Sequence, residues 1–592
     1  MAFPLIGHRN HDPTAPAPKR WRDGIRKFDM PGNSTTLITG QPRFSDPRLA
    51  GIAASQGPLA AWQDAVQHNP NSAAQGVSGD FAVGFTDAAG RGFLAVDRFS
   101  VRGLCYSVQD GQLRFASSAL ALADGLAGSR PDAGADIDPQ AIFDYLYFHV
   151  IPSPRTIFKG IYRLPAGHFA LFENGEIVVR PYWTPKFEEP SNPSFEALKA
   201  RFRQLLQDGA ANQLDDGKPA CFLSGGTDSS TVAGMAALAS GKTVSTYSIG
   251  FDAQGYDEME FARIAAKHFK TDHHEYYVTP ADLVQSIPKV AAHFDQPFGN
   301  SSALPAYYCA LMARDDGVTK LLAGDGGDEL FGGNSRYAKQ RLFGWYDHVP
   351  GFLQKGLMEP VLLSRAAAAV PILSKAGSYV EQARVPMPDR LQMYNLIMRL
   401  GPAEVLTPAM MAQVDVATPL ALQRDVWQAA AGASLLNQEL TFDWRFTLAE
   451  SDLPKVVGAT SLAGIAVGFP LLNDQLVAFS QRLPSAYKLK GAKLRWFFKE
   501  ALTGFLPDEI ITKKKQGFGL PFGVWANNNA PLKALATESL QSLVARGVVR
   551  QDFVQSLLAV RLAEHPGYFG EMVWILMMLE QWVRQHKPGF RV

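Results

Sequence analysis

The segment from about residue 195 to residue 323 constrains the fold most, because helical patterns alternate there with short apolar runs. Amphipathic or small-residue helices are predicted at 195–214, 227–238 and 258–269. Four apolar runs have the length of one strand each: 219–223, 243–249, 273–278 and 318–323. Strands that alternate with helices predict an α/β fold, a parallel sheet covered by helices on both faces. From about residue 334 onward the pattern is mostly helical.

The first third of the chain has a different rhythm, in which apolar runs alternate with Gly and Asp turns. Runs such as 79–85 and 93–97 recur at strand spacing, and 167–183 resembles a hairpin. This pattern predicts an antiparallel, β-rich domain. We expect four parts: a mobile N-terminal arm (1–32), the β-rich domain (33–185), a linker rich in Pro, Ser and Glu (186–194) and the second domain (195–592).

Composition excludes several classes of protein. The 592 residues hold 57 Lys and Arg against 56 Asp and Glu, a net charge of +1, which argues against nucleic-acid and membrane-surface partners. The sequence contains no run of 18 apolar residues, so we expect no membrane span. Three distant cysteines, Cys105, Cys221 and Cys309, predict neither disulfides nor a Cys-rich zinc site, and favour a reducing, cytoplasmic location. The histidines near 268–274 lack the spacing of a zinc site.

The segment 222–230, FLSGGTDSS, carries the first chemical signal. It follows a predicted strand and opens a helix, so backbone N–H groups and hydroxyls face the carboxyl edge of the sheet, where phosphate binds. An acid in a phosphate loop requires a bridging cation, so Asp228 is a candidate Mg²⁺ ligand. The alternative is a tight strand-to-helix turn with a capping serine.

Two further clusters follow along the chain. Residues 323–333 hold three acids and five glycines after a buried strand, and Asp328 is positioned to complete the metal site; the alternative is a solvated loop. The run 513–515 has three lysines beside the apolar turn 517–521. Two of these lysines are expected in solvent, and one could point toward a phosphate.

These three clusters, in this order, resemble the asparagine synthetase B family. Further matching segments are 247–251, 257–275, 295–305 and 512–525 in the second domain, and 79–87, 96–106, 155–168 and 181–183 in the first. The resemblance implies an N-terminal Ntn-hydrolase-like domain of the class II glutamine amidotransferase type. It also implies a C-terminal pyrophosphate-loop synthetase domain, whose sheet is parallel and whose later half is helical.

The resemblance also implies roles for single residues. The residues expected to hold ATP are Leu223, Ser224, Gly225, Gly226, Asp228, Ser229, Ser230, Ile249, Ala323 and Gly324. Asp228 and Asp328 would bind Mg²⁺. Lys515 would stabilise the transition states of adenylation and amide formation, and Asp325, where many members have Glu, would assist the amine.

Two departures from the family are visible. Glutaminase members begin Met-Cys-Gly, whereas this sequence begins Met1-Ala2-Phe3 and lacks the glutamine-binding loop between 35 and 78. We therefore expect no glutamine hydrolysis, and a first domain kept for scaffolding or recognition. In the segment 464–474, Ala466 and Gly468 stand where members of the family usually have Glu and Arg. The loss of this acid and base is expected to open the pocket nearby and to disfavour free aspartate as the substrate. The alternative is compensated drift at two structural positions.

Three functions follow. The first is an AMP-forming ligase that activates a carboxylate for attack by ammonia or an amine. The second is a macrolactam-forming ligase, related to lasso-peptide cyclases and β-lactam synthetases. The third is a silent adaptor that binds ATP, against which the retained Asp228, Asp328 and Lys515 argue. Substrates would be small-molecule or peptide carboxylates and amines; a homodimer or a partner from the same biosynthetic cluster is left open.

Overall fold

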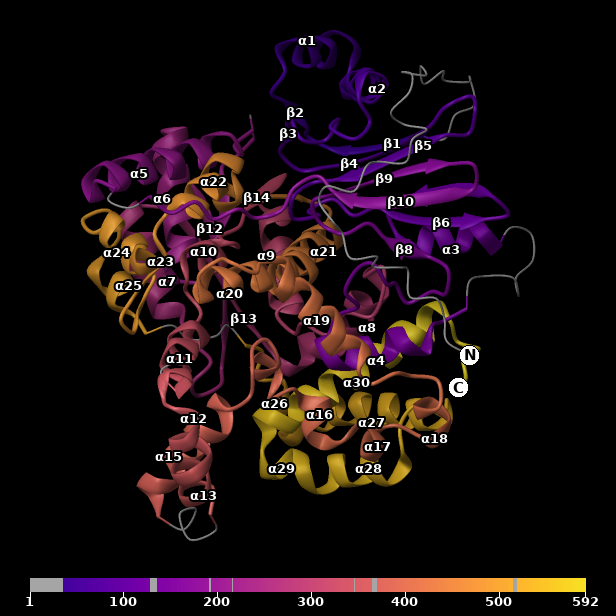
Figure 1. The fold of residues 1–592 in the computed structure, drawn as a ribbon, viewed down its shortest axis with the longest axis vertical. Coiled ribbons are helices and arrows are strands. Elements are labelled where there is room, and N and C mark those ends of the chain that lie inside the picture. The colour runs from indigo at the N-terminus through magenta and orange to yellow at the C-terminus, as the bar shows by residue number, and fades with distance from the viewer. Residues whose placement is uncertain are drawn as a thin grey trace.

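The computed structural model describes residues 36–127, 136–190, 193–215, 217–344, 346–364, 370–514 and 519–592, so the arm expected at 1–32 lies outside it. Figure 1 shows the β-rich part at one end of the molecule and the parallel sheet beside it. The last helices lie below these parts, and a helical arm projects at the other end.

The β-rich domain is antiparallel, as its sequence rhythm predicts. Its main sheet has the order β1-β4-β5-β9-β10: Thr36–Gly40, Phe81–Thr86, Gly92–Val96, His168–Glu173 and Glu176–Pro181. A second sheet, β7-β6-β8, comprises Gln112–Ala116, Cys105–Gln109 and Tyr162–Arg163. Strand β4 is buried on both faces because Phe81 and Phe85 pack on Trp62, whereas Ala82 faces the second sheet. Four helices accompany the sheets: α1 (Pro47–Gln56), α2 (Pro58–His68), α3 (Ala119–Ala127) and α4 (Pro139–Phe148).

The second domain is built on the predicted parallel sheet. Its order is β13-β12-β11-β14-β15, with strands Asp272–Val278, Ser245–Phe251, Ala220–Phe222, Lys320–Leu322 and Ala466–Gly468. All its pairings are parallel. Helix α5 (Phe195–Ala211) precedes the first of these strands in the chain. The helices that follow, up to β14, are α6 (Thr227–Ser240), α7 (Met259–Phe269), α8 (Pro280–His293) and α9 (Ala303–Asp315). The edge strand β15 is not anticipated by the sequence pattern, since it is short and comes late in a helical region.

The C-terminal half is helical, as expected. The elements used below are α16 (Leu396–Leu400), the π-helix η5 (Trp444–Asp452), α21 (Leu453–Ala463), α24 (Trp496–Leu502) and α30 (Pro566–His586). Most of α30 is buried, because it packs on α8, α26 (Phe522–Asn528) and α27 (Ala530–Ala545). Among the described residues, no helix is long and apolar enough to cross a membrane.

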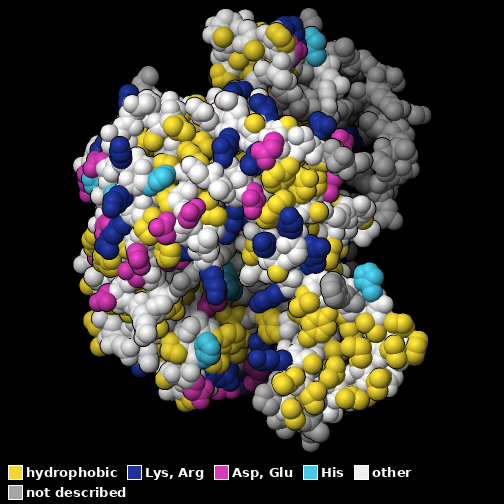
Figure 2. All heavy atoms as spheres, turned by 90° about the vertical axis from the view of Figure 1, so that its left-hand side faces the viewer, with side chains coloured by type: hydrophobic (Ala, Val, Ile, Leu, Met, Phe, Trp, Pro, Cys, Tyr) yellow, Lys and Arg dark blue, Asp and Glu magenta, His cyan; other side chains and the backbone are white. Residues whose placement is uncertain are grey.

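The projecting arm carries exposed apolar side chains. It comprises α11 (Ser335–Phe343), α12 (Gly351–Leu353), α13 (Glu359–Leu362) and α15 (Pro371–Ala383). Phe352 is 74% exposed and Ile372 is 80% exposed. Figure 2 shows apolar side chains gathered over this part of the surface, at its lower right.

A buried ion network joins the two domains. Glu450 of η5 pairs with Arg163 of β8 and with Arg445, and it accepts a hydrogen bond from Ser153 Oγ at 2.7 Å. Arg445 in turn donates to the Ser153 carbonyl oxygen at 2.6 Å. Asp295 of the second domain makes a second contact with the first domain. Its carboxylate oxygens accept hydrogen bonds from the first two N–H groups of α3, at 2.8 Å each.

The chain between the domains is held by a buried lysine. The Lys488 ammonium donates to Asn437 Oδ1 at 3.0 Å and lies 4.9 Å from the centre of the Phe187 ring. Asn437 donates to Glu189 at 2.6 Å, so the cluster anchors the segment expected to be a linker. Burial lowers the pKa of Lys488 to about 7.

Lys488→Met is expected to flatten the dependence of thermal stability on pH. The unfolded chain holds the Lys488 proton up to its ordinary pKa of 10.5, whereas the folded protein loses it near pH 7. The unfolded state therefore binds more protons between these values, and stability rises with pH in that window. Calorimetric melting temperatures from pH 6.5 to 9.5 should rise more steeply for the wild type than for the variant; equal slopes would contradict the assignment.

Candidate functional site

A cavity of about 1070 Å³ lies at the carboxyl ends of β11, β12 and β14. Parallel α/β sheets bind ligands at this edge. Nine of the residues singled out from the sequence line it: Leu223, Ser224, Gly226, Asp228, Ser229, Ile249, Gly324, Asp325 and Asp328. Gly225, Ser230 and Ala323 lie behind this wall, and Ser230 and Ala323 are buried. Lys515 lies outside the described residues.

The loop after β11 turns directly into α6. Gly225 has a φ of +69°, and a Cβ there would lie 2.4 Å from the Ala262 nitrogen, so only glycine fits against α7. The Ser229 hydroxyl accepts the Ser224 N–H at 3.1 Å, which closes the loop on itself. No side chain caps α6 at Gly226. The first N–H groups of α6 therefore lie where the helix dipole favours an anion.

The loop after β14 packs against the first loop without room for side chains. A Cβ on Gly324 would lie 2.8 Å from the Ser229 nitrogen, and one on Gly327 would lie 2.0 Å from Asp228 Oδ1. A Cβ on Gly333 would lie 1.7 Å from Asp328 Oδ1. These glycines thus bring the two loops into contact and place the carboxylates of Asp228 and Asp328 side by side.

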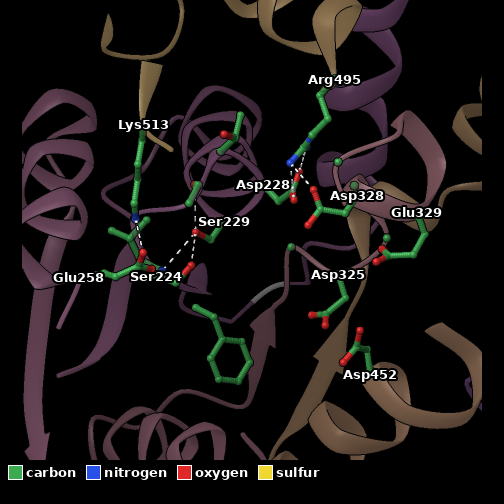
Figure 3. Close-up of a pocket in the computed structure, with 18 of the residues that line it drawn as sticks. Ser224, Asp228, Ser229, Glu258, Asp325, Asp328, Glu329, Asp452, Arg495 and Lys513 are labelled. Carbon is green, nitrogen blue, oxygen red and sulfur yellow. Dashed lines mark hydrogen bonds and ion pairs between the residues drawn. The ribbon is translucent and has the colours of Figure 1, made fainter. Parts of the chain in front are cut away.

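Arg495 bridges these two carboxylates. It immediately precedes α24, and its guanidinium pairs with Asp228 through both terminal nitrogens, one at 2.9 Å from Oδ2, and with Asp328 Oδ1 at 2.9 Å. Figure 3 shows the guanidinium reaching both acids from the opposite side of the cavity. Although burial opposes its charge, the two aspartates raise the pKa of Arg495 above its usual value. A cation therefore occupies the point on which both acids converge.

A second charged group lies deeper in the cavity. Lys455 of α21 lies 3.0 Å from Asp452 and 3.4 Å from Asp325. In Figure 3 the carboxylates of Asp325 and Asp452 face each other. Burial raises the pKa of Asp325, and the Lys455 ammonium opposes that shift. Asp325 is thus a carboxyl group whose pKa is raised by burial and which lies beside an ammonium group inside the cavity.

Of the lysine run, the structure describes Lys513 and Lys514, and Lys513 points into the cavity. Lys513 Nζ lies 3.1 Å from Glu258 Oε1 and 3.5 Å from the Gly225 carbonyl oxygen, and its ammonium is 4.3 Å from the centre of the Phe261 ring. Lys514 also lines the cavity. A positive charge from this run therefore lies beside the first loop, as Figure 3 shows.

Sequence reasoning missed Arg495, Lys455, Asp452 and Glu258. Arg495 lies 267 residues from Asp228, and Lys455 lies 130 residues from Asp325. Asp452 and Glu258 enter the site through the lysines that they contact, Lys455 and Lys513. None of the four stands in a glycine-rich motif. Two weak signals in the sequence could have pointed to these residues. One is the basic residue Arg495 before the helix 496–502, and the other is the acid–lysine pair at 452 and 455, three residues apart.

The expectation that Ala466 and Gly468 open the pocket is wrong for this cavity. Neither is among the described residues that line it. Ala466 pairs with Lys320 at the amino end of β14, and a Cβ on Gly468 would lie 2.6 Å from Gln213 Oε1. The two positions belong to the packing of the edge strand, which favours the structural alternative.

The three cysteines are all buried. Cys105, the one in the β-rich domain, is 1% exposed on β6, and desolvation raises the pKa of its thiol well above the usual value. Burial also raises the pKa of Cys221 and Cys309. A buried neutral thiol is a poor nucleophile, so these cysteines are structural.

This fold and cavity define a carbon–nitrogen ligase with an amidotransferase-like first domain. The chain belongs to the asparagine synthase family, whose pattern matches residues 201–584, and the glutamine amidotransferase domain family matches residues 64–183. Members of the asparagine synthase family use ATP.

The similar proteins span most of the chain at low identity. Asparagine synthetase [glutamine-hydrolyzing] 1 of Bacillus subtilis is 24% identical over 82% of this chain and 74% of its own length. Asparagine synthetase [glutamine-hydrolyzing] 3 of the same organism is 24% identical over 72% and 64%. Amidase chyE of Penicillium rubens is 23% identical over 78% and 73%.

Arg495→Met is expected to destabilise the protein and to make its stability respond to Mg²⁺. Removing the guanidinium leaves two adjacent carboxylates uncompensated, at a cost of roughly 3–5 kcal/mol. Mg²⁺ prefers such oxygen ligands, so it should raise the melting temperature of the variant in EDTA-treated buffer more than that of the wild type.

Arg546→Met is the matched control. Arg546 is also buried, but among the described residues Glu580, at 2.7 Å, is the one carboxylate with which it pairs; its other hydrogen bonds go to the Pro588 and Phe590 carbonyl oxygens. The control should lose stability without recovery by Mg²⁺. An Arg495→Met protein that Mg²⁺ does not stabilise would exclude the two aspartates as a cation site.

Proposed function

We propose that this protein is an AMP-forming amide-bond ligase that takes ammonia or an amine directly and hydrolyses no glutamine itself. One observation carries the proposal: the amino terminus of α6, the Asp228 and Asp328 carboxylates and Lys513 all border one cavity. That set provides donors for phosphate oxygens, acids for a divalent cation and a positive charge for the leaving group.

The nucleotide phosphates would lie on the loop after β11. Ser224, Gly226 and Ser229 border the cavity at the start of α6, while Ile249 and Gly324 flank it on neighbouring strands. Ile249 is our candidate for the adenine pocket. Ala323 would act through its backbone, since its N–H donates to the Gly468 carbonyl oxygen at 2.9 Å and fixes the strand end behind Gly324.

The donor set fits Mg²⁺ bound together with phosphate. The described residues contain no group of three or more His, Cys, Asp or Glu side chains that could hold a metal by themselves. Mg²⁺ in nucleotide sites needs only one or two carboxylates besides the phosphates, and Asp228 and Asp328 would supply them. When bound, the ion would offset the charge on the phosphate oxygens. Arg495 neutralises the same carboxylates and would turn toward the phosphates.

Carboxylate activation requires positive charge around the pyrophosphate. As the substrate carboxylate attacks the α-phosphorus, charge grows on the departing phosphates, and Lys513 and Arg495 border the cavity in which it grows. Lys515 stays a candidate for the same task. An amine attacks the acyl-adenylate only as the free base, and Asp325, whose pKa is raised by burial, is our candidate to accept its proton.

Two other functions differ from this proposal in measurable ways. In a macrolactam-forming ligase the carboxylate and the amine belong to one molecule, so the product is cyclic. In a silent adaptor, ATP binds without being cleaved. The charged groups Asp228, Asp328, Arg495 and Lys513 around one cavity would serve ATP binding in all three cases, so cleavage of ATP is what separates the adaptor from the ligases.

The decisive measurement is carboxylate-dependent exchange of labelled pyrophosphate into ATP. Exchange is expected with at least one carboxylate in a panel of amino acids and aspartyl or glutamyl peptides. Asp228→Asn should reduce it by about 100-fold or more, because a carboxylate that would hold Mg²⁺ beside the phosphates is lost. The exposed Asp552→Asn change should have no effect. Nucleotide binding without exchange on any carboxylate would favour the adaptor.

Glutamine is expected not to serve as a nitrogen source. Cys105 is the only cysteine of the first domain and its thiol is buried, so no described thiol there can attack glutamine. Glutamate release from glutamine should stay at background, whereas ammonium or an amine should support amide formation. Adding a separate glutaminase should restore glutamine use. Glutamate release by the pure protein would refute this part of the proposal.

A further inference from the structure

A second cavity, of about 650 Å³, lies beside the first, and the proposed adenylation chemistry makes no use of it. It lies between the end of α4, the segment around α16, the π-helix η5 and the start of α30. Figure 1 shows α4, α16 and α30 together in the lower right of the molecule. The volume is in the range of about 300–1,000 Å³ that is typical of ligand sites.

Only a thin partition separates the two cavities. Ser451 lines the second cavity and the next residue, Asp452, lines the first. Asn300, which lines the first cavity, donates to Ser451 Oγ at 3.1 Å and to Asp452 Oδ1 at 3.4 Å. The wider turn of a π-helix ends at this point, and such turns are frequent at functional sites. A ligand that passes this hydrogen bond reaches Asp325 and Lys455.

The second cavity contains a buried polar group that lacks a partner. Gln423 is 1% exposed, and its Oε1 accepts the Tyr147 hydroxyl at 3.1 Å. Its Nε2 has no hydrogen-bond partner among the described residues. Leaving a buried amide donor unpaired is costly, so a ligand with a carbonyl or carboxylate oxygen is the natural partner. The amides of Gln392 and Asn395 line the same space.

One cation of this cavity has no carboxylate partner among the described residues. Arg336 pairs with Asp443, and Glu571 Oε1 lies 3.2 Å from His149 Nδ1. Arg399 is exposed and stacks over the rings of Tyr394 at 5.2 Å and Tyr568 at 6.0 Å, and no described carboxylate pairs with it. An anion is therefore favoured beside these rings.

We propose that the second cavity binds an acidic peptide, whose reacting carboxylate passes Asn300 into the first cavity. This inference rests on the proposed ligase function and names its substrate class. Peptide carbonyl groups would pair with Gln423 and its neighbouring amides, a second acidic group would face Arg399, and apolar side chains would lie on the aromatic rings. A free amino acid would fill only the first cavity and gain none of these contacts.

The test uses a degenerate pool of N-acetylated, C-amidated hexapeptides, each with two acidic residues and one aromatic residue. Anisotropy of a fluorescein-labelled pool reports binding, and pyrophosphate exchange reports activation. Arg399→Glu is expected to weaken binding about ten-fold or more and to raise the KM for the pool, with the KM for ATP unchanged. Tyr394→Ala, at a side chain 55% exposed, should weaken binding without unfolding the protein.

Arg561→Glu is the matched control, because Arg561 stacks over Phe553 and Phe569 in the same manner but lies outside both cavities. It should leave binding unchanged. Free aspartate that supports exchange as efficiently as the pool would overturn the inference while the ligase function stands. Unaltered binding in Arg399→Glu would overturn it as well. Arg399-dependent binding without exchange would instead support the peptide site and refute the ligase function.

Discussion

The bridge from Arg495 to Asp228 and Asp328 is the interaction on which the arrangement of the site depends. It joins three segments that are far apart in sequence, and it does so where two glycine-rich loops leave no room for other side chains. Two carboxylates this close would repel each other without a cation. The loop after β11, the loop after β14 and the start of α24 therefore keep their positions only while a positive charge lies between them.

The π-helix η5 organises the opposite side of the cavity. Its residues face three directions: Thr447 and Ser451 toward the second cavity, Asp452 toward the first, and Glu450 toward Arg163 of the first domain. Thr447 and Ser451, four residues apart, share one face, whereas Glu450 and Asp452 on either side of Ser451 face other parts of the molecule. One short element can thus border a reaction chamber, a ligand cavity and a domain interface.

Much of the fold could be predicted from the sequence, because it depends on local patterns. The runs 219–223, 243–249, 273–278 and 318–323 are strands of one parallel sheet, and 167–183 contains a hairpin, since apolar periodicity and turn residues act over a few positions. The glycine-rich loops were visible for the same reason. Arg495, Lys455 and Gln423 were not, since their roles arise from partners that only the tertiary fold brings near. Ala466 and Gly468 do not line the cavity, and sequence order did not reveal that they pack against neighbours of the edge strand such as Gln213.

The network around Glu450 bears on why the first domain persists in a ligase that we propose takes no nitrogen from glutamine. Burial lowers the pKa of Arg445 to about 9, and its guanidinium pairs with Glu450 in the same buried network. Ser153 and Arg163 of the first domain help to compensate the buried charges beside it. Deleting that domain would open Glu450 and Arg445 to water next to Asp452 and remove the groups that fix their positions. In the ligase that we propose, the first domain would therefore be kept as a cover for its neighbour's buried charges, independently of any catalysis of its own.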